Sequence, residues 1–226
     1  MIEVIVIGEG QTEETFVRDV LAPQMFGRDI SLQPRLVGTS PTGRGGSLSR
    51  DRVLRFIRNT LRERTDTYVT TFFDLYELRG DFPGVAASRT QTDPLKQCGL
   101  IESALAKEAI EISGCREDRF FAHIQPYEFE ALLFSDVSSF GSVRADWGRY
   151  IGKLQDVRNS AETPEHINSG PDTHPSRHLE NILQPRFRKV LHGNGVASSI
   201  GIARMRSECL HFNAWLAKIA LLSPLS

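Results

Sequence analysis

Short apolar runs alternate with segments of helical spacing near the start of the chain. The run at residues 2–7 ends at a glycine, which is typical of a buried strand in a parallel sheet. Thr12 then begins a segment with apolar residues at helical spacing and with acidic residues in its first turn. The opening therefore predicts a strand, a tight turn and a helix, which together are the first half of a βα unit.

The same alternation continues through the first 140 residues. Strands are predicted at residues 30–37, 68–73 and 119–125, and helices at residues 48–64, 93–111 and 126–134. A proline near the start of the last helix suits its first turn. Strands that alternate with helices predict an α/β fold, with a mostly parallel sheet flanked by helices.

The strand pattern stops after about residue 140. Helices are predicted at residues 175–191 and 203–219, and the second has Cys209, Phe212 and Trp215 at the spacing of a buried helix face. We therefore expect an α/β domain at residues 1–140 and a C-terminal helical appendage, residues 141–226, packed on it.

The composition is that of an ordinary soluble protein with one sizeable core. The chain has 226 residues, of which 40% are hydrophobic and 24% are charged. Its 27 basic and 28 acidic side chains give a net charge of −1, so the whole molecule does not attract nucleic acid. Binding of nucleic acid would require a local basic patch.

The sequence predicts a cytoplasmic protein without a membrane span. It has no signal-peptide pattern and no apolar run approaching the roughly 20 residues that a bilayer requires. Its three cysteines form no CxxC pair, which argues against a zinc ribbon and fits a reducing compartment. Pro175 separates His174 from His178 and argues against a helical zinc pair, while His123 is expected in the core or at its rim.

Acidic residues follow three of the predicted strands. Glu9 follows the first strand, Asp74 and Glu77 follow the third, and Glu128 and Glu130 follow the fourth. Ligands of open α/β sheets bind at the carboxyl ends of strands, and carboxylates that converge there need a hard cation to offset their repulsion. We therefore predict that these five residues bind Mg²⁺ or Mn²⁺, which would activate water for phosphodiester cleavage.

Some of these acidic residues have a purely structural explanation, because a carboxylate at the start of a helix interacts favourably with the helix dipole. It applies to Glu13, Glu14, Glu128 and Glu130. Glu9 and Asp74 stand at the abrupt ends of apolar strands and are less easily explained in this way. These two are therefore the predicted catalytic residues, with Glu9 as general acid or base and Asp74 as metal ligand.

Basic residues are needed to hold a phosphate. The predicted substrate-binding residues are Arg44 in a glycine-rich loop, Arg177 and Lys189. The loop lacks the P-loop pattern, so it is not a nucleotide cradle. Arg177 has a second interpretation, in which it pairs with a carboxylate and shapes the interface with the appendage. The arginine-rich side of residues 48–64 is either a track for a nucleic-acid backbone or a solvated helix face.

Four spaced motifs carry a family resemblance: GEGQTE at residues 8–13, FDLY at 73–76, DFPG at 81–84 and IQPYEFEA at 124–131. They resemble a family of uncharacterised bacterial proteins with a Toprim-like fold, distantly similar to the Toprim domain of the OLD nucleases. Segments at residues 170–177 and 209–216 extend the resemblance over nearly the whole chain.

The resemblance implies a Mg²⁺ site built from a glutamate after the first strand and an Asp-x-Asp pair after a later strand. Glu9 matches the glutamate and Asp74 matches the first aspartate. Tyr76 stands where the second aspartate is expected, so Glu77, Glu128 or Glu130 would have to supply the missing carboxylate. The resemblance also implies a role in defence against foreign DNA and an AAA-type ATPase partner.

The leading hypothesis is a divalent-metal-dependent phosphodiester hydrolase, and specifically a nuclease. The alternative, favoured by Tyr76, is a non-catalytic Toprim-like module that binds or regulates an ATPase partner. A phosphatase with Asp74 as nucleophile ranks last, because no second acid and lysine are clearly paired with it. The oligomeric state and the choice between DNA, RNA and nucleotide substrates stay open.

Overall fold

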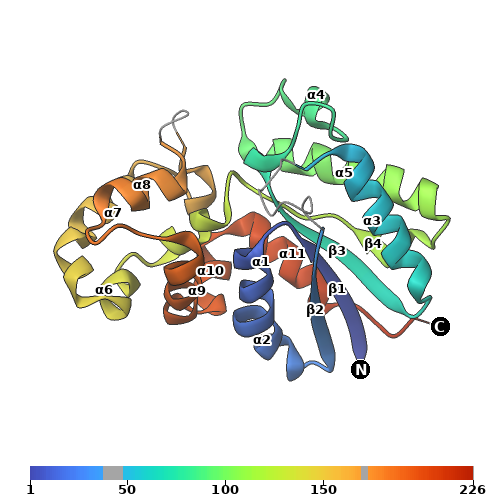
Figure 1. Cartoon of the computed structure of the whole chain (residues 1–226), viewed down its shortest axis with the longest axis horizontal. Coiled ribbons are helices and arrows are strands. Elements are labelled where there is room, and N and C mark those ends of the chain that lie inside the picture. Colours follow the sequence, from blue (N-terminus) through green and yellow to red (C-terminus); the bar gives the residue numbers. More distant parts are fainter. Residues whose placement is uncertain (38–47, 169–172, 226) are drawn as a thin grey trace.

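A parallel β-sheet forms the centre of the computed structural model, which describes residues 1–37, 48–168 and 173–225 (Figure 1). The strand order is β2-β1-β3-β4, and β5 also pairs with β3. The strands are β1 (Ile2–Gly8), β2 (Ile30–Leu36), β3 (Thr67–Asp74), β4 (Phe120–Phe121) and β5 (Ile124–Gln125). The prediction of an α/β fold with a parallel sheet is therefore confirmed.

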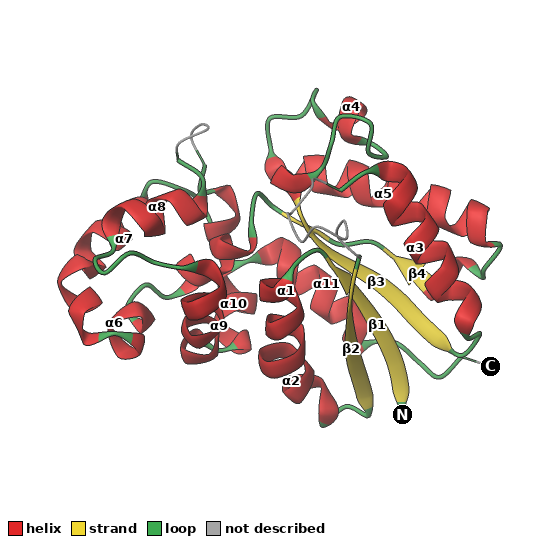
Figure 2. Cartoon of the chain, in the orientation of Figure 1, coloured by secondary structure: helices red, strands yellow, loops and turns green. Residues whose placement is uncertain are grey.

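Helices cover both faces of this sheet (Figure 2). Those of the first half are α1 (Gln11–Thr15), the π-helical η1 (Phe16–Leu21), α2 (Ala22–Phe26), α3 (Arg50–Glu63), α4 (Val85–Ser88) and α5 (Pro94–Ser113). Short 3₁₀ helices in the same half are η2 (Leu75–Glu77), η3 (Glu117–Arg119) and η4 (Phe129–Ser135). The first three helical segments follow one another without a break, so the first helix continues past Pro23.

The second half is helical, as expected from the missing strand pattern. Its elements are α6 (Ser139–Val143), η5 (Ala145–Tyr150), α7 (Ile151–Asn159), η6 (Pro164–His166), α8 (Pro175–Ile182), α9 (Lys189–Ile200), α10 (Ile202–Glu208) and α11 (Leu210–Ala220). Figure 1 shows α6 to α8 beside the sheet, while α11 lies against it. In the described part of the chain, no helix combines the length and apolar character needed to cross a membrane.

The alternation of side chains along β1 separates two cores. Val4 and Val6 face a core shared with η1, α2 and the C-terminal helices. Ile5 and Ile7 face a second core, shared with α3 and α5. This is the pattern of a central parallel strand that is buried on both faces.

Helix α11 is built into the first of these cores. The Trp215 ring stacks on Phe72 of β3 with 5.3 Å between centroids, and its Nε1 donates a hydrogen bond to Thr70 Oγ1 at 2.9 Å. Phe212 packs against both rings. Residues on both sides of position 140 therefore share one continuous core.

Several predicted elements are interrupted. The strand expected at residues 119–125 is divided into β4 and β5, and His123 lies between them. The helix expected at residues 175–191 stops before Pro185, which lacks the N–H that a continuing helix needs, and α9 begins at Lys189. The helix expected at residues 203–219 is divided at Cys209, whose backbone is extended. These breaks position several of the side chains described below.

Candidate active site at the carboxyl ends of the strands

The carboxyl ends of β1, β3 and β5 meet at one edge of the sheet. Gly8 at the end of β1 lies beside Phe72, and Asp74 at the end of β3 lies beside Gln125 of β5. Because the strands are parallel, Glu9, Asp74 and the segment after Gln125 leave the sheet at the same edge. The predicted convergence of strand-end acids at this edge is present.

The Lys189 ammonium lies among three of these carboxylates. Its Nζ is 3.1 Å from Asp74 Oδ2, 3.2 Å from Glu130 Oε2 and 3.5 Å from Glu13 Oε1. The three acids come from the end of β3, from η4 and from α1, and Lys189 is the first residue of α9. This arrangement therefore links the C-terminal helices to the edge of the sheet.

The three carboxylates differ in their other partners. Asp74 Oδ1 accepts a hydrogen bond from the Phe129 backbone N–H at 2.8 Å. Glu13 Oε2 accepts one from the Gly10 backbone N–H at 3.0 Å, as expected for an acid at a helix start. Glu130 is completely buried, and in the described part of the chain its oxygens have Lys189 as an ion-pair partner but no hydrogen bond of good geometry.

Glu128 faces the C-terminal segment instead. Its Oε2 accepts from the Ser176 backbone N–H at 3.0 Å and lies 3.0 Å from His174 Nδ1. Tyr127 before it has a φ of 58°, in the left-handed region that side chains rarely adopt. Glu128 therefore joins the start of η4 to the start of α8, while Glu130 faces Lys189.

Burial and mutual repulsion raise the pKa of the carboxyl groups. Burial, with help from the charges of Glu77, Asp74 and Glu13, raises the pKa of Glu9 to about 8 despite Lys189. Burial likewise raises the pKa of Asp74 to about 7 and that of Glu130 to about 8, although Lys189 opposes both shifts.

The charge state of Lys189 follows from the same neighbours. Burial lowers its pKa, but Asp74, Glu130 and Glu13 outweigh that effect, so its pKa lies well above the usual value. At neutral pH the site therefore holds an ammonium together with carboxyl groups that still carry protons. Such a group of acids can exchange protons for a cation.

Some of the site residues predicted from the sequence lie at this edge of the sheet, and others do not. Asp74 and Glu130 contact Lys189, and Glu9 is near enough for Asp74, Lys189 and the exposed Glu77 to influence its pKa. The Arg177 side chain is 46% exposed and pairs with Glu180 of its own helix at 3.5 Å. Arg44 lies outside the described residues.

Two features of the edge were not anticipated. Glu13 was interpreted only as a helix-start residue, yet it also faces Lys189. Tyr76, which occupies the place of an expected aspartate, is 43% exposed and packs its ring 5.7 Å from Tyr127 and 5.4 Å from His174. The only hint in the sequence was the position of both residues inside the GEGQTE and FDLY motifs.

The donor set fits a hard cation. Carboxylate oxygens are the ligands that Mg²⁺ and Mn²⁺ prefer, and Asp74, Glu130 and Glu13 bring such oxygens together around Lys189. Among the described residues, no three of these carboxylates bring ligand atoms within 4.8 Å of one another. A cation here would therefore be held by one or two carboxylates and completed by water, as is usual for Mg²⁺.

Comparison with known proteins identifies a family whose function is unknown. A family model described as "Domain of unknown function (DUF4276)" matches residues 8–220, a range that includes the acidic residues at the strand ends and Lys189. No curated protein and no solved structure matches the chain.

Proposed function

We propose that this chain, which belongs to the DUF4276 family, is a divalent-metal-dependent phosphodiester hydrolase. The observation that carries the proposal is the meeting of Glu9, Asp74 and Glu130 with Lys189 at the carboxyl edge of a parallel sheet. Ligand sites of open α/β sheets lie at this edge. Carboxylates that can hold a metal ion, beside a basic side chain that can meet a phosphate, are components of a phosphoryl-transfer site.

Asp74 and Glu130 are the residues that would hold Mg²⁺ or Mn²⁺. When bound, the cation supplies charge neutralisation at the phosphate and polarisation of the attacking water. Asp74 is oriented for this role because its Oδ1 is fixed by the Phe129 N–H, which leaves Oδ2 toward Lys189. The second ligand expected at Tyr76 is supplied, in this proposal, by Glu130.

Lys189 contacts carboxylates before substrate binds and a phosphate afterwards in this proposal. Without substrate its ammonium lies within 3.5 Å of Asp74, Glu130 and Glu13. Its side chain is 35% exposed, so the flexible stem can carry the ammonium toward a bound phosphate. There it would stabilise the charge that develops on the scissile group.

Glu9 is the proposed proton donor. Its pKa of about 8 keeps the carboxyl group protonated at neutral pH, and its side chain is only partly buried. A protonated carboxyl group with a pKa near the working pH is suited to donate to the leaving oxygen. Glu9 therefore acts as general acid in the cleavage step.

A polynucleotide is the proposed substrate. The exposed Tyr76 ring, flanked by Tyr127 and by His174 near Glu128, offers a stacking surface for an unpaired base. The resemblance to the Toprim domains of the OLD nucleases supports the same choice. On the same resemblance we propose a role in defence against foreign DNA and an AAA-type ATPase as partner.

The test is cleavage of plasmid DNA and of RNA with Mn²⁺ or Mg²⁺. We expect Glu9→Gln and Asp74→Asn to lose at least 100-fold in rate. Asp118→Asn is the matched control and should stay within twofold, because Asp118 is exposed and forms a local ion pair with Arg116. Equal cleavage by wild type and both site variants would exclude this active site.

A second candidate is a non-catalytic module that binds or regulates an ATPase partner. Tyr76 in place of an acid and the Lys189 ammonium among the carboxylates favour it. In that case Mn²⁺ would bind without any cleavage, and Asp74→Asn would leave nuclease assays unchanged. Association with a AAA-type ATPase, measured by pull-down with purified components, would then be the remaining function.

A further inference from the structure

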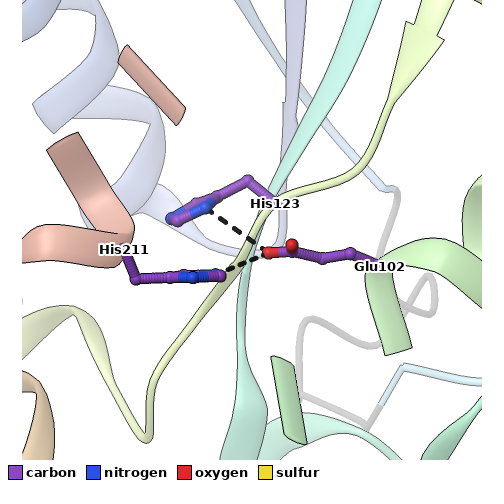
Figure 3. Close-up of side chains that lie close together, drawn as sticks. All are labelled: Glu102, His123 and His211. Carbon is purple, nitrogen blue, oxygen red and sulfur yellow. Dashed lines mark hydrogen bonds and ion pairs between the residues drawn. The ribbon is translucent and has the colours of Figure 1, made fainter. Parts of the chain in front are cut away.

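A second group of metal-binding side chains lies between α5, the β4–β5 connection and α11. It consists of Glu102, His123 and His211, whose side chains point toward one another (Figure 3). His211 Nε2 is 2.7 Å from Glu102 Oε1, and His123 Nδ1 is 3.6 Å from the same oxygen. One ligand atom from each residue lies within 4.8 Å of the others.

These separations suit a small metal ion. Two ligand atoms about 2.1 Å from a tetrahedral zinc ion are about 3.4 Å apart. The contact of 3.6 Å already has this spacing, and the contact of 2.7 Å needs to open by a fraction of an ångström. The two separations from Glu102 Oε1 are therefore close to those that a bound metal requires.

Each imidazole has a further polar neighbour. His123 Nε2 is 3.4 Å from Gln125 Oε1, and a proton on Nε2 would leave the Nδ1 lone pair facing the Glu102 carboxylate. A ring nitrogen of His211 hydrogen-bonds to the backbone of Ile124. Metal-binding histidines usually have such outer partners, because these fix the tautomer and the ring orientation.

With its proton on Nε2, buried His123 would turn an acceptor nitrogen toward Glu102 Oε1, which is also an acceptor. Glu102 Oε1 also accepts the Ile124 backbone N–H at 2.8 Å. A lone pair and a carboxylate in contact are unfavourable unless a proton or a cation lies between them.

The group is open on one side. A cavity of about 180 Å³ borders all three residues and is further lined by Phe121, Trp215 and Lys218. It is large enough for several water molecules. A metal held by three protein ligands would therefore keep a position for water or another exchangeable ligand.

We propose that Glu102, His123 and His211 form a binding site for a divalent transition metal of the zinc class, separate from the acidic site. Two imidazoles and one carboxylate suit Zn²⁺ or a similar ion, whereas Mg²⁺ prefers oxygen ligands alone. The ligands are 21 and 88 residues apart along the chain, so the metal joins three distant elements. Because the site exists only in the folded chain, binding stabilises the fold.

The experiment is a calorimetric titration of the metal-stripped full chain with Zn²⁺, paired with Co²⁺ absorption spectra. We expect one Zn²⁺ per chain, a tetrahedral Co²⁺ spectrum, and at least 30-fold weaker binding in Glu102→Gln and His211→Gln. The matched control is His166→Gln, since His166 faces Asp93 at 3.8 Å with similar exposure but belongs to no group of three ligands among the described residues. Asp74→Asn should also bind Zn²⁺ normally, which distinguishes this site from the acidic one.

Two results would overturn the proposal: a wild-type chain that binds no Zn²⁺, or a Glu102→Gln variant that binds it unchanged. If the variants fail to fold, X-ray absorption of the wild-type zinc complex decides the question. Two imidazole ligands and one carboxylate support the site, and an all-oxygen shell refutes it. This outcome does not depend on phosphodiester cleavage, because its readout is metal binding alone.

Discussion

The Lys189 ammonium lies 3.2 Å from the carboxylate of Glu130, which is completely buried and has no other ion-pair partner among the described residues. A buried carboxylate is costly to ionise unless a positive charge accompanies it. The same ammonium also neutralises Asp74 and Glu13. The charge balance of the sheet edge therefore depends strongly on a residue contributed by α9.

Removal of the Lys189 charge should destabilise the protein in a pH-dependent way. We expect Lys189→Met to lose about 3 kcal/mol of unfolding free energy at pH 9, because it leaves buried carboxylates uncompensated. The loss should be smaller at pH 6, where the raised pKa values of Asp74 and Glu130 keep both groups protonated. Urea unfolding at both pH values measures this, with the exposed Lys153→Met as control. An equal loss at both pH values would contradict the charge argument.

Stability of the metal-free protein should fall as pH rises from about 5 to 9. The pKa of Glu9, Asp74 and Glu130 is raised to about 8, 7 and 8, so the folded state binds more protons than the unfolded chain over this range. The free energy of unfolding then decreases with pH, and the contribution of these groups is lost above their folded pKa values. Thermal unfolding in chelator measures the slope. Glu130→Gln should flatten it, and a slope unchanged by that variant would argue against the Glu130 assignment.

The affinity for divalent cations should rise with pH, whereas the stability of the metal-free protein falls. Mn²⁺ must displace protons from Asp74 and Glu130, so its affinity should rise through pH 7 to 8. At 100 times its dissociation constant the ion stabilises the fold by about 2.7 kcal/mol. A Mn²⁺ titration followed by thermal shift at pH 6 and 8.5 tests this. The shift should disappear in Asp74→Asn and persist in Asp118→Asn, whereas equal shifts in both variants would place the ion elsewhere.

Gly84 in the DFPG motif should not tolerate a side chain. Its φ is +79°, and a Cβ there would lie 2.8 Å from Ile101 Cα and 2.9 Å from the Leu100 backbone oxygen of α5. We expect Gly84→Ala to cost about 2–4 kcal/mol, from the left-handed backbone and the clash together. Gly27→Ala is the control, because nothing lies within 4 Å of its added Cβ. Denaturant unfolding of the two variants should differ clearly, and similar midpoints would contradict the close approach to α5.

The local sequence pattern was sufficient to predict the parallel sheet and to place Glu9 and Asp74 at the same edge of it. The apolar run before Gly8 and the β-branched run before Asp74 specify parallel strands, which bring Glu9 and Asp74 to the same edge. Strand direction alone dictates this result, because the ends of parallel strands meet. The buried position expected for His123 is confirmed as well.

The partners of these residues were decided only by the tertiary structure. Lys189 follows Asp74 by 115 residues, and His211 follows Glu102 by 109 residues. Neither pairing leaves a periodic signal, because each depends on how α9 and α11 pack against the sheet. The sequence by itself determined which carboxylates leave the sheet together. Long-range packing of the apolar helix faces determined which cation neutralises them and which histidines meet Glu102, since those distances are set by the shared core.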